Sequence, residues 1–187
     1  WNIIGQLHEQ DPVFSGVKLA GNKGHQYALM AGLMTAKDRC DISVSIDADL
    51  QDDIEVIRDM VAAYKDGAQV VYGVRSKRET DTFFKRFTAQ SYYKLLDKMG
   101  VDVVYNHADY RLLSKPALQA LSQYTEVNLF LRGMVPTLGF QTATVYYERA
   151  ERFAGESKYP LSKMLALAWQ GITSFSLKPI QLIGGLG

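Results

Sequence analysis

The chain has little of what builds disulfide frameworks or membrane spans. It contains one cysteine, Cys40, among 187 residues, which excludes an internal disulfide and fits a reducing compartment. We interpret Cys40 as inert packing. No apolar run approaches the roughly 20 residues that a membrane-spanning helix needs. The net charge of +1 gives no bulk attraction to nucleic acid, so nucleic acid is not an expected partner and any basic site must be local.

What is present fits one globular domain. Apolar residues make up 47% and charged residues 22% of the chain, which is ordinary for such a domain. A chain of 187 residues is long enough to bury a sizeable core. It opens at Trp1 in a predicted helix and closes on the apolar stretch IQLIGGLG. We therefore expect it to be a piece of a longer protein.

Segments with the period of a strand alternate with segments that have the period of a helix. Such alternation predicts an α/β fold, a mainly parallel sheet with helices on both faces. A further helix follows the second of these strands and ends before Gly67. The expected strands are 16–20, 42–46, 69–74, 108–114 and 142–150, and the other expected helices are 26–36, 82–99, 115–122 and 160–175.

The stretch DISVSIDADLQDD, residues 41–53, follows a predicted strand with a run of acids. Asp52 is followed three residues later by Glu55, which is the spacing of a capping box. Asp52 and Asp53 therefore have a structural explanation, because acids at a helix start bind free N–H groups and favour the helix dipole.

Asp47 and Asp49 precede that cap and lack this explanation. They share a tight turn at the carboxyl end of the strand, where sheets of this kind bind ligands. Both can face one cation, and Gln51 adds a neutral oxygen. Carboxylate and amide oxygens suit Mg²⁺ or Mn²⁺, which take further ligands from water and substrate phosphates. The sequence therefore predicts a divalent-metal site.

A phosphatase is a rival explanation of the same motif. Haloacid-dehalogenase phosphatases also place D-x-D after an apolar strand, with the first Asp as the nucleophile. There the motif lies on the first strand and is followed two residues later by Thr or Val. In this chain Gln51 stands at that position, and a predicted strand precedes the motif.

Two basic segments are candidates for binding phosphate. GVRSKRETDTFFKR, residues 73–86, contains Arg75 and Arg86 and follows the next strand. It is either a solvated loop or a diphosphate clamp, since arginine binds phosphate oxygens bidentately. RFAGESKYP, residues 152–160, is either an ordinary loop or one that closes over an anionic substrate.

Other chemically capable side chains have structural explanations. His25 in NKGHQ stands near a helix start, and we interpret it as a structural hydrogen-bonding residue. Trp169, Tyr146 and Tyr147 are interpreted as packing. The predicted amphipathic helix at 160–175 either packs on the sheet or lies in a membrane interface.

Seven segments together resemble glycosyltransferase family 2, and within it the polyprenyl-phosphate hexosyltransferases of the dolichyl-phosphate mannose synthase and bactoprenol glucosyltransferase type. They are NKGHQYALMAGL, SIDADLQDD, VVYGVRSKR, FKRFTAQSYYKLL, ADYRLLS, NLFLRG and RFAGESKYPL. The resemblance covers nearly the whole chain. It implies a GT-A fold, a Rossmann-like sheet whose D-x-D holds the metal on the donor diphosphate. The family's first strand and nucleotide-binding turn would precede Trp1, so we expect the N-terminal strands to be missing. Gly21 stands where the family usually has arginine.

The resemblance also implies roles for individual residues. Asp47 would face the donor and the metal, with Asp49 and Gln51 as direct ligands. Asp109 matches the acid proposed as the base or as the group that orients the acceptor. The substrate-binding positions carried over in the same way are Asp47, Arg75, Arg86, Arg132, Arg152, Ser157 and Lys158.

The implied activity is inverting transfer of a hexose from a nucleotide sugar to a polyprenyl phosphate such as undecaprenyl phosphate. UDP-glucose is the first expected donor, before GDP-mannose and UDP-N-acetylhexosamine. We expect residues 1–159 to form the catalytic core, and residues 160–187 to form a juxtamembrane helix and the start of a membrane segment. The expected place is the cytoplasmic face of the bacterial inner membrane, and a homo-oligomer is left open. The alternative function is a non-catalytic, membrane-associated module that binds nucleotide sugars.

Overall fold

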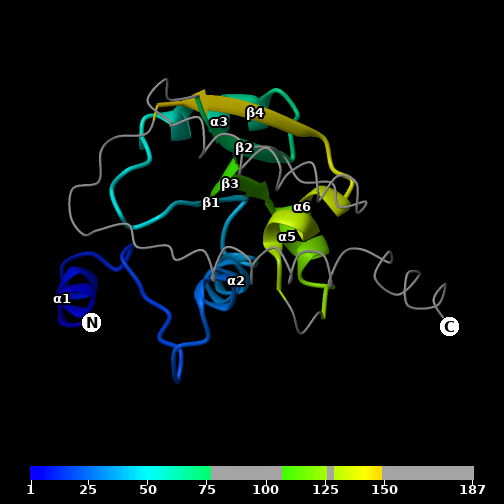
Figure 1. Cartoon of the computed structure of the whole chain (residues 1–187). Coiled ribbons are helices and arrows are strands. Elements are labelled where there is room, and N and C mark those ends of the chain that lie inside the picture. The colour runs from blue at the N-terminus through cyan, green and yellow to red at the C-terminus, as the bar shows by residue number, and fades with distance from the viewer. Residues whose placement is uncertain (77–106, 126–128, 149–187) are drawn as a thin grey trace, which may run out of the picture.

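The computed structural model describes residues 1–76, 107–125 and 129–148 (Figure 1). The predicted helices at 82–99 and 160–175 lie outside the described residues. The described elements are α1 (Asn2–Gln10), α2 (His25–Ala36), β1 (Ile42–Ser45), α3 (Val56–Lys65), β2 (Val70–Arg75), β3 (His107–Ser114), α5 (Lys115–Leu121), α6 (Leu131–Thr137) and β4 (Thr142–Tyr147).

The strands form one mixed sheet in the order β1-β3-β2-β4. β3 pairs antiparallel with both β1 and β2, and β2 pairs parallel with β4. The α/β prediction is confirmed, and β1, β2 and β4 share one direction. β3 departs from the expected parallel arrangement, because it lies between β1 and β2 and runs against them. Its first residues therefore lie at the sheet end where the other three strands finish.

Helices cover both faces of the sheet, with α3 on one side and α2, α5 and α6 on the other (Figure 1). The side chains of β2 alternate between the two cores, because successive residues of a strand point to opposite faces. Val70, Tyr72 and Val74 pack with α5 and α6, whereas Val71 packs with α3. β2 is thus covered on both faces, which explains its nearly continuous apolar sequence.

Local chemistry explains where two helices begin and end. The Ser114 hydroxyl accepts a hydrogen bond from the backbone N–H of Ala117 at 3.3 Å, and Pro116 stands in the first turn of α5. Gly67 follows α3 with φ +109°, a conformation that suits glycine. The predicted stop of this helix is therefore confirmed.

The N-terminal segment differs from expectation. The predicted strand at 16–20 is wrong: these residues pair with none of the described strands, and Val17 is 47% exposed. A short apolar run becomes a strand only beside a partner that completes its hydrogen bonds. α1 is present as predicted but buries none of its side chains. Among the described helices, none has the length and apolar character to span a membrane.

Gly73→Ala should destabilise this fold. A Cβ at Gly73 would lie 2.8 Å from Met60 Cε and 2.9 Å from Tyr110 Cδ1. Met60 can shift, but the Tyr110 hydroxyl is anchored to the backbone oxygen of Asp53 at 2.8 Å. We expect the free energy of unfolding, measured in urea, to fall by about 1–3 kcal/mol. Gly32→Ala is the matched control, because its Cβ meets open space in α2 and should be neutral or stabilising. Equal effects would contradict the steric argument.

Candidate active site

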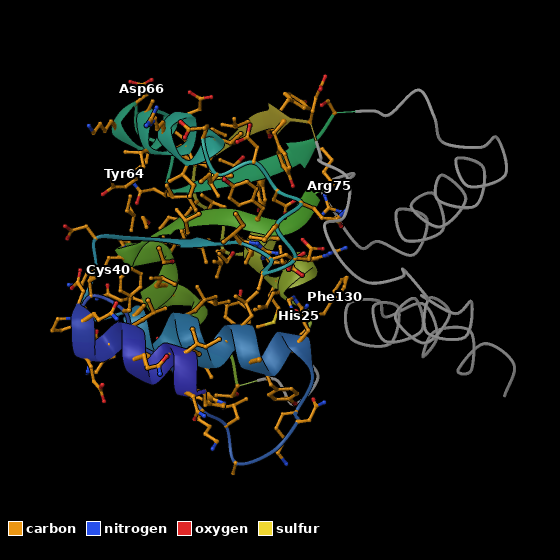
Figure 2. All side chains as sticks on the ribbon, turned by 90° about the vertical axis from the view of Figure 1, so that its left-hand side faces the viewer. His25, Cys40, Tyr64, Asp66, Arg75 and Phe130 are labelled. Carbon is orange, nitrogen blue, oxygen red and sulfur yellow. The ribbon has the colours of Figure 1, made fainter. Side chains whose placement is uncertain are left out.

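Polar side chains from all four described strands meet at one end of the sheet. Asp47 follows β1, Arg75 ends β2, Asp109 stands near the start of β3 and Tyr147 ends β4. β3 runs antiparallel to β1 and β2, so its first residues lie beside the last residues of the other strands. Figure 2 shows His25, at the start of α2, at the same end as Arg75. This sheet end is the place predicted for ligand binding.

Asp109 is the centre of a charge cluster. Its Oδ1 accepts a hydrogen bond from Nη2 of Arg111 at 2.6 Å and lies 3.5 Å from Nε of Arg132. Its Oδ2 lies 2.9 Å from Nε2 of His25. The side chains of Asp109 and Arg111 are 7% and 1% exposed. Both carboxylate oxygens are thus engaged inside the protein, where an unpaired charge would be strongly destabilising.

The backbone at the start of α6 is held from two sides. The N–H of Leu131 donates a hydrogen bond to Oε1 of Gln26 at 3.1 Å, and its C=O accepts one from Nη1 of Arg111 at 3.2 Å. Gln26 belongs to α2 and Arg111 to β3. The next residue along α6 is Arg132, so these bonds fix the backbone from which Arg132 reaches Asp109.

The cluster changes the proton affinity of its members. Burial alone would raise the pKa of Asp109, but the hydrogen bond from His25 and the charges of Arg132 and Arg111 outweigh it. The pKa of Asp109 therefore lies well below its usual range. The hydrogen bond to Asp109 raises the pKa of His25 above its ordinary value of 6.5. Asp109 is therefore ionised at neutral pH, and its carboxylate favours the protonated form of His25.

Asp52 belongs to a second cluster and does not cap a helix. α3 begins at Val56 with Glu55 in the N-cap position, and no side chain caps it. The Asp52 side chain, 0% exposed, accepts a hydrogen bond from the hydroxyl of Tyr147 at 2.6 Å and one from Nη2 of Arg75 at 3.3 Å. The capping prediction is wrong because the helix starts later than the sequence suggests, which leaves Asp52 in the preceding loop.

This second cluster holds Arg75 in place. Nε of Arg75 donates a hydrogen bond to the Tyr147 hydroxyl at 3.3 Å, and its Nη2 lies 4.0 Å from Oδ2 of Asp47. The ring of Tyr147 packs edge-on against Tyr110, with centroids 5.3 Å apart. Burial and the bond to Asp52 raise the pKa of the Tyr147 hydroxyl, which stays protonated and donates. Tyr147 was predicted as packing alone, and it also links β4 to the acidic loop.

The residues predicted to bind metal lie in the turn after β1. Burial, and then the charge of Asp52, raise the pKa of Asp47, so negative charge here lacks full compensation. Oδ1 of Asp49 accepts a hydrogen bond from the backbone N–H of Gln51 at 3.2 Å. No group of three or more His, Cys, Asp or Glu side chains converges in the described ranges. Two carboxylates and an amide still fit Mg²⁺, which binds through few protein ligands beside substrate phosphates.

Comparison with known proteins identifies the family. Residues 1–122 match the family described as "Glycosyl transferase family 2". The chain belongs to glycosyltransferase family 2. It is 55% identical over all 187 residues to "Uncharacterized glycosyltransferase YkoT" of Bacillus subtilis (strain 168), of which it covers 56%. It is 40% identical over 182 residues, 97% of its length, to "Bactoprenol glucosyl transferase" of Shigella phage SfV, of which it covers 59%.

A third relative of this glycosyltransferase family 2 chain is the "Prophage bactoprenol glucosyl transferase homolog" of Escherichia coli (strain K12). It is 39% identical over 182 residues, 97% of this chain and 59% of the relative. The chain thus spans a little over half the length of these curated relatives. Membership of the family confirms the resemblance drawn from the motifs and sets aside the phosphatase hypothesis.

All predicted site residues that fall within the described part of the structure lie at this end of the sheet. The roles of these residues remain predictions. Sequence reasoning missed Arg111, although it stands two positions after Asp109 on one strand and therefore shares its face. The residues gathered are Asp47, Asp49, Gln51, Arg75, Asp109 and Arg132. Arg86, Arg152, Ser157 and Lys158 lie outside the described residues.

Replacing Asp52 tests its place in the second cluster. Asp52→Ala leaves Arg75 and Tyr147 without their shared acceptor, so the free energy of unfolding should fall by about 2 kcal/mol or more. Loss of a helix cap would be about 1 kcal/mol. Asp53→Ala is the control: the side chain of this exposed neighbour accepts a hydrogen bond from the backbone N–H of Glu55, and the substitution keeps the backbone oxygen that Tyr110 binds. Urea unfolding measures both, and equal losses of about 1 kcal/mol or less would restore the capping interpretation.

Asp109 should shape the pH dependence of stability. Its pKa is lower in the folded chain than in the unfolded chain, so the ionised group adds stability above about pH 4. That contribution is lost as the pH falls below this value. The difference in the free energy of unfolding between the wild type and Asp109→Asn should therefore shrink between about pH 5 and about pH 2. Urea unfolding across this range measures it.

A second measurement covers the case in which Asp109→Asn does not fold. Carbon-13 NMR of the wild-type carboxyl groups follows the ionisation of Asp109 directly. A midpoint at or above about pH 4 would show that the surrounding cations do not govern this group.

Proposed function

We propose that this chain carries the catalytic part of an inverting hexosyltransferase, which moves a hexose from a nucleotide sugar to a polyprenyl phosphate. The observation that carries the proposal is the meeting of two kinds of side chain at one sheet end. Asp47 and Asp49 suit a divalent cation, and Arg75 and Arg132 suit phosphate oxygens. A nucleotide-sugar donor needs both. The relatives named bactoprenol glucosyl transferase support a polyprenyl phosphate as the acceptor and glucose as the sugar.

Charge stabilisation of the leaving diphosphate would lower the barrier. Mg²⁺ or Mn²⁺, held by Asp47 and Asp49 with Gln51, supplies positive charge to the diphosphate when bound. Arg75 lies beside Asp47 and is oriented by Asp52 before substrate arrives. A donor group that is already oriented needs no reorganisation during the reaction, which is the main source of electrostatic catalysis.

The acceptor needs positioning more than activation. A phosphomonoester has a second pKa near 6, so most of it is a nucleophilic dianion at neutral pH. Asp109 has both carboxylate oxygens engaged and acts by holding Arg132 and His25 in position. In-line attack of the phosphate oxygen on the anomeric carbon breaks the bond to the diphosphate and inverts that carbon.

Because the acceptor is a lipid, we assign the reaction to a membrane surface, and the cytoplasmic face is the side that we propose. We assign membrane contact to residues 160–175, whose apolar positions form a stripe near several lysines. These residues lie outside the described part of the structure, so this step rests on their sequence pattern. In the same way, residues 1–159 as the catalytic core and residues 160–187 as a juxtamembrane region remain part of the proposal.

Asp49→Asn should remove metal-dependent donor binding. With Mn²⁺ present, its affinity for UDP should fall at least about tenfold, because a neutral amide holds the cation far more weakly than a carboxylate. Calorimetry on the full-length protein measures the affinity. Asp53→Asn is the matched control, since Asp53 is an exposed acid of the same loop whose side chain accepts a hydrogen bond from the backbone N–H of Glu55. Unchanged Mn²⁺-dependent affinity in Asp49→Asn would overturn the metal assignment.

The same protein tests the transfer itself. It is incubated with undecaprenyl phosphate and, in turn, UDP-glucose, GDP-mannose and UDP-N-acetylglucosamine, and the glycolipid product is measured. We expect product from UDP-glucose in wild type and in Asp53→Asn, and none in Asp49→Asn. Donor binding without product from any donor would support the non-catalytic nucleotide-sugar module.

A further inference from the structure

His25 offers a ring nitrogen that the proposed reaction has not yet used. It is the first residue of α2, and 55% of its side chain is exposed. Nε2 lies 2.9 Å from Oδ2 of Asp109. The other nitrogen, Nδ1, has no hydrogen-bond partner within residues 1–76, 107–125 and 129–148. An imidazole that is anchored through one nitrogen can present the other to a ligand.

The bond to Asp109 decides which nitrogen exchanges a proton. An ionised carboxylate only accepts hydrogen bonds, so Nε2 carries a hydrogen in the neutral ring and in the cationic ring. The proton that comes and goes is therefore the one on Nδ1. Asp109 is poorly placed to take it, because its Oδ2 faces Nε2 and its Oδ1 lies against Arg111 and Arg132.

The charges that face His25 come from three elements. Asp109 of β3 and Asp47 of the turn after β1 are negative, and Arg132 of α6 is positive. Arg111 lies buried against Asp109. Two carboxylates thus stand against two arginines near His25, so the group becomes positive when the ring is protonated. An anion beside Arg132 and His25 would be attracted electrostatically.

We propose that Nδ1 of His25 binds an oxygen of the acceptor's phosphomonoester and takes up the proton that its monoanionic form carries. The phosphate O–H bond breaks and leaves its electron pair on oxygen, while an N–H bond forms at Nδ1. A monoanion and a neutral imidazole become a dianion and an imidazolium, with total charge unchanged. Arg132 holds a second phosphate oxygen. After transfer, the imidazolium releases its proton to water.

This inference rests on the proposed function and makes His25 a catalytic residue, with Asp109 as the residue that positions it. Phosphate oxygens could also come from the donor, so the source has to be distinguished. A nucleotide sugar has no titrating phosphate proton near neutral pH, because both of its phosphates are esterified. Only a phosphomonoester exchanges a proton with His25 in this way.

Proton–nitrogen NMR of the full chain tests the site without any transfer reaction. A saturating short-chain isoprenyl phosphate should raise the pKa of His25 by about one unit, which corresponds to about tenfold tighter binding to the protonated ring. Inorganic phosphate should shift it in the same direction. The resonances of His8, exposed on α1, should not respond. No shift at saturation, or no binding by phosphorus-31 NMR, would overturn the proposal.

A parallel titration with UDP-glucose separates the two sources of phosphate. We expect the His25 resonances to keep their midpoint when UDP-glucose is bound. An equal rise with UDP-glucose would assign the site to the donor and overturn the proposal. The shift with isoprenyl phosphate in Arg132→Gln should be smaller than in the wild type, because one of the two cations is gone.

Kinetics of the full-length protein give the second readout. In wild type, kcat/KM for the polyprenyl phosphate should fall at alkaline pH as His25 loses its proton. In His25→Gln, kcat/KM should no longer fall at alkaline pH. At neutral pH its kcat/KM should be at least about tenfold lower than in the wild type, the loss expected for one charge-assisted hydrogen bond. His25→Lys should recover part of the alkaline activity, because lysine stays cationic. His8→Gln is the control.

Two further outcomes separate a failure of the His25 proposal from a failure of the proposed function. A loss in His25→Gln that lies only in the KM for the donor would show a structural role and overturn the proposal. If the NMR shift is present but no variant, wild type included, transfers sugar, then the proposed function fails and the phosphate site stands. The two failures are thus distinguishable.

Discussion

Arg111 brings a guanidinium into the interior between β1 and β2, where 1% of its side chain reaches solvent. A buried charge needs a partner close by, and Asp109 supplies it at 2.6 Å from the same strand. The Ser45 hydroxyl donates to the backbone oxygen of Asp109 at 2.5 Å and ties β1 to this point. The carboxylate fixed in this way then orients His25 of α2 and Arg132 of α6. Two helices and two strands thus depend on one ion pair.

The second cluster also pairs a buried charge with an opposite one, but here the buried member is the acid Asp52. The side chain of Asp52 is fully buried and binds the partly exposed Arg75 directly. It also accepts a hydrogen bond from the Tyr147 hydroxyl, which in turn accepts one from Arg75. Between the two clusters lies Asp47, which burial and its acidic neighbours leave short of positive charge. The sheet end therefore combines oriented arginines with an acid that a cation would complete. That combination matches a substrate with a metal-bound diphosphate.

Most of the fold could be predicted because its main elements have local causes. Alternation marks β1, a nearly continuous apolar run marks β2, helical spacing and Gly67 mark α3, and Ser114 with Pro116 marks α5. The strand at 16–20 was wrong because pairing depends on a neighbour that the pattern does not reveal. α6 was not predicted, since seven residues with an internal proline are too short to show a helical period. The reversal of β3 is likewise a matter of pairing, which no local pattern specifies.

Sequence patterns predicted which chemical groups the candidate site contains: paired acids after one strand, arginines after the next, and Asp109 through the family resemblance. They also indicated the family, through motifs spread over nearly the whole chain. Only the tertiary structure decided how these groups pair. His25 meets Asp109 across 84 positions, and Tyr147 meets Asp52 across 95. Such contacts depend on how strands and helices pack, whereas sequence patterns report on neighbours within a few turns of chain, so the partners of buried charges become visible only in the folded molecule.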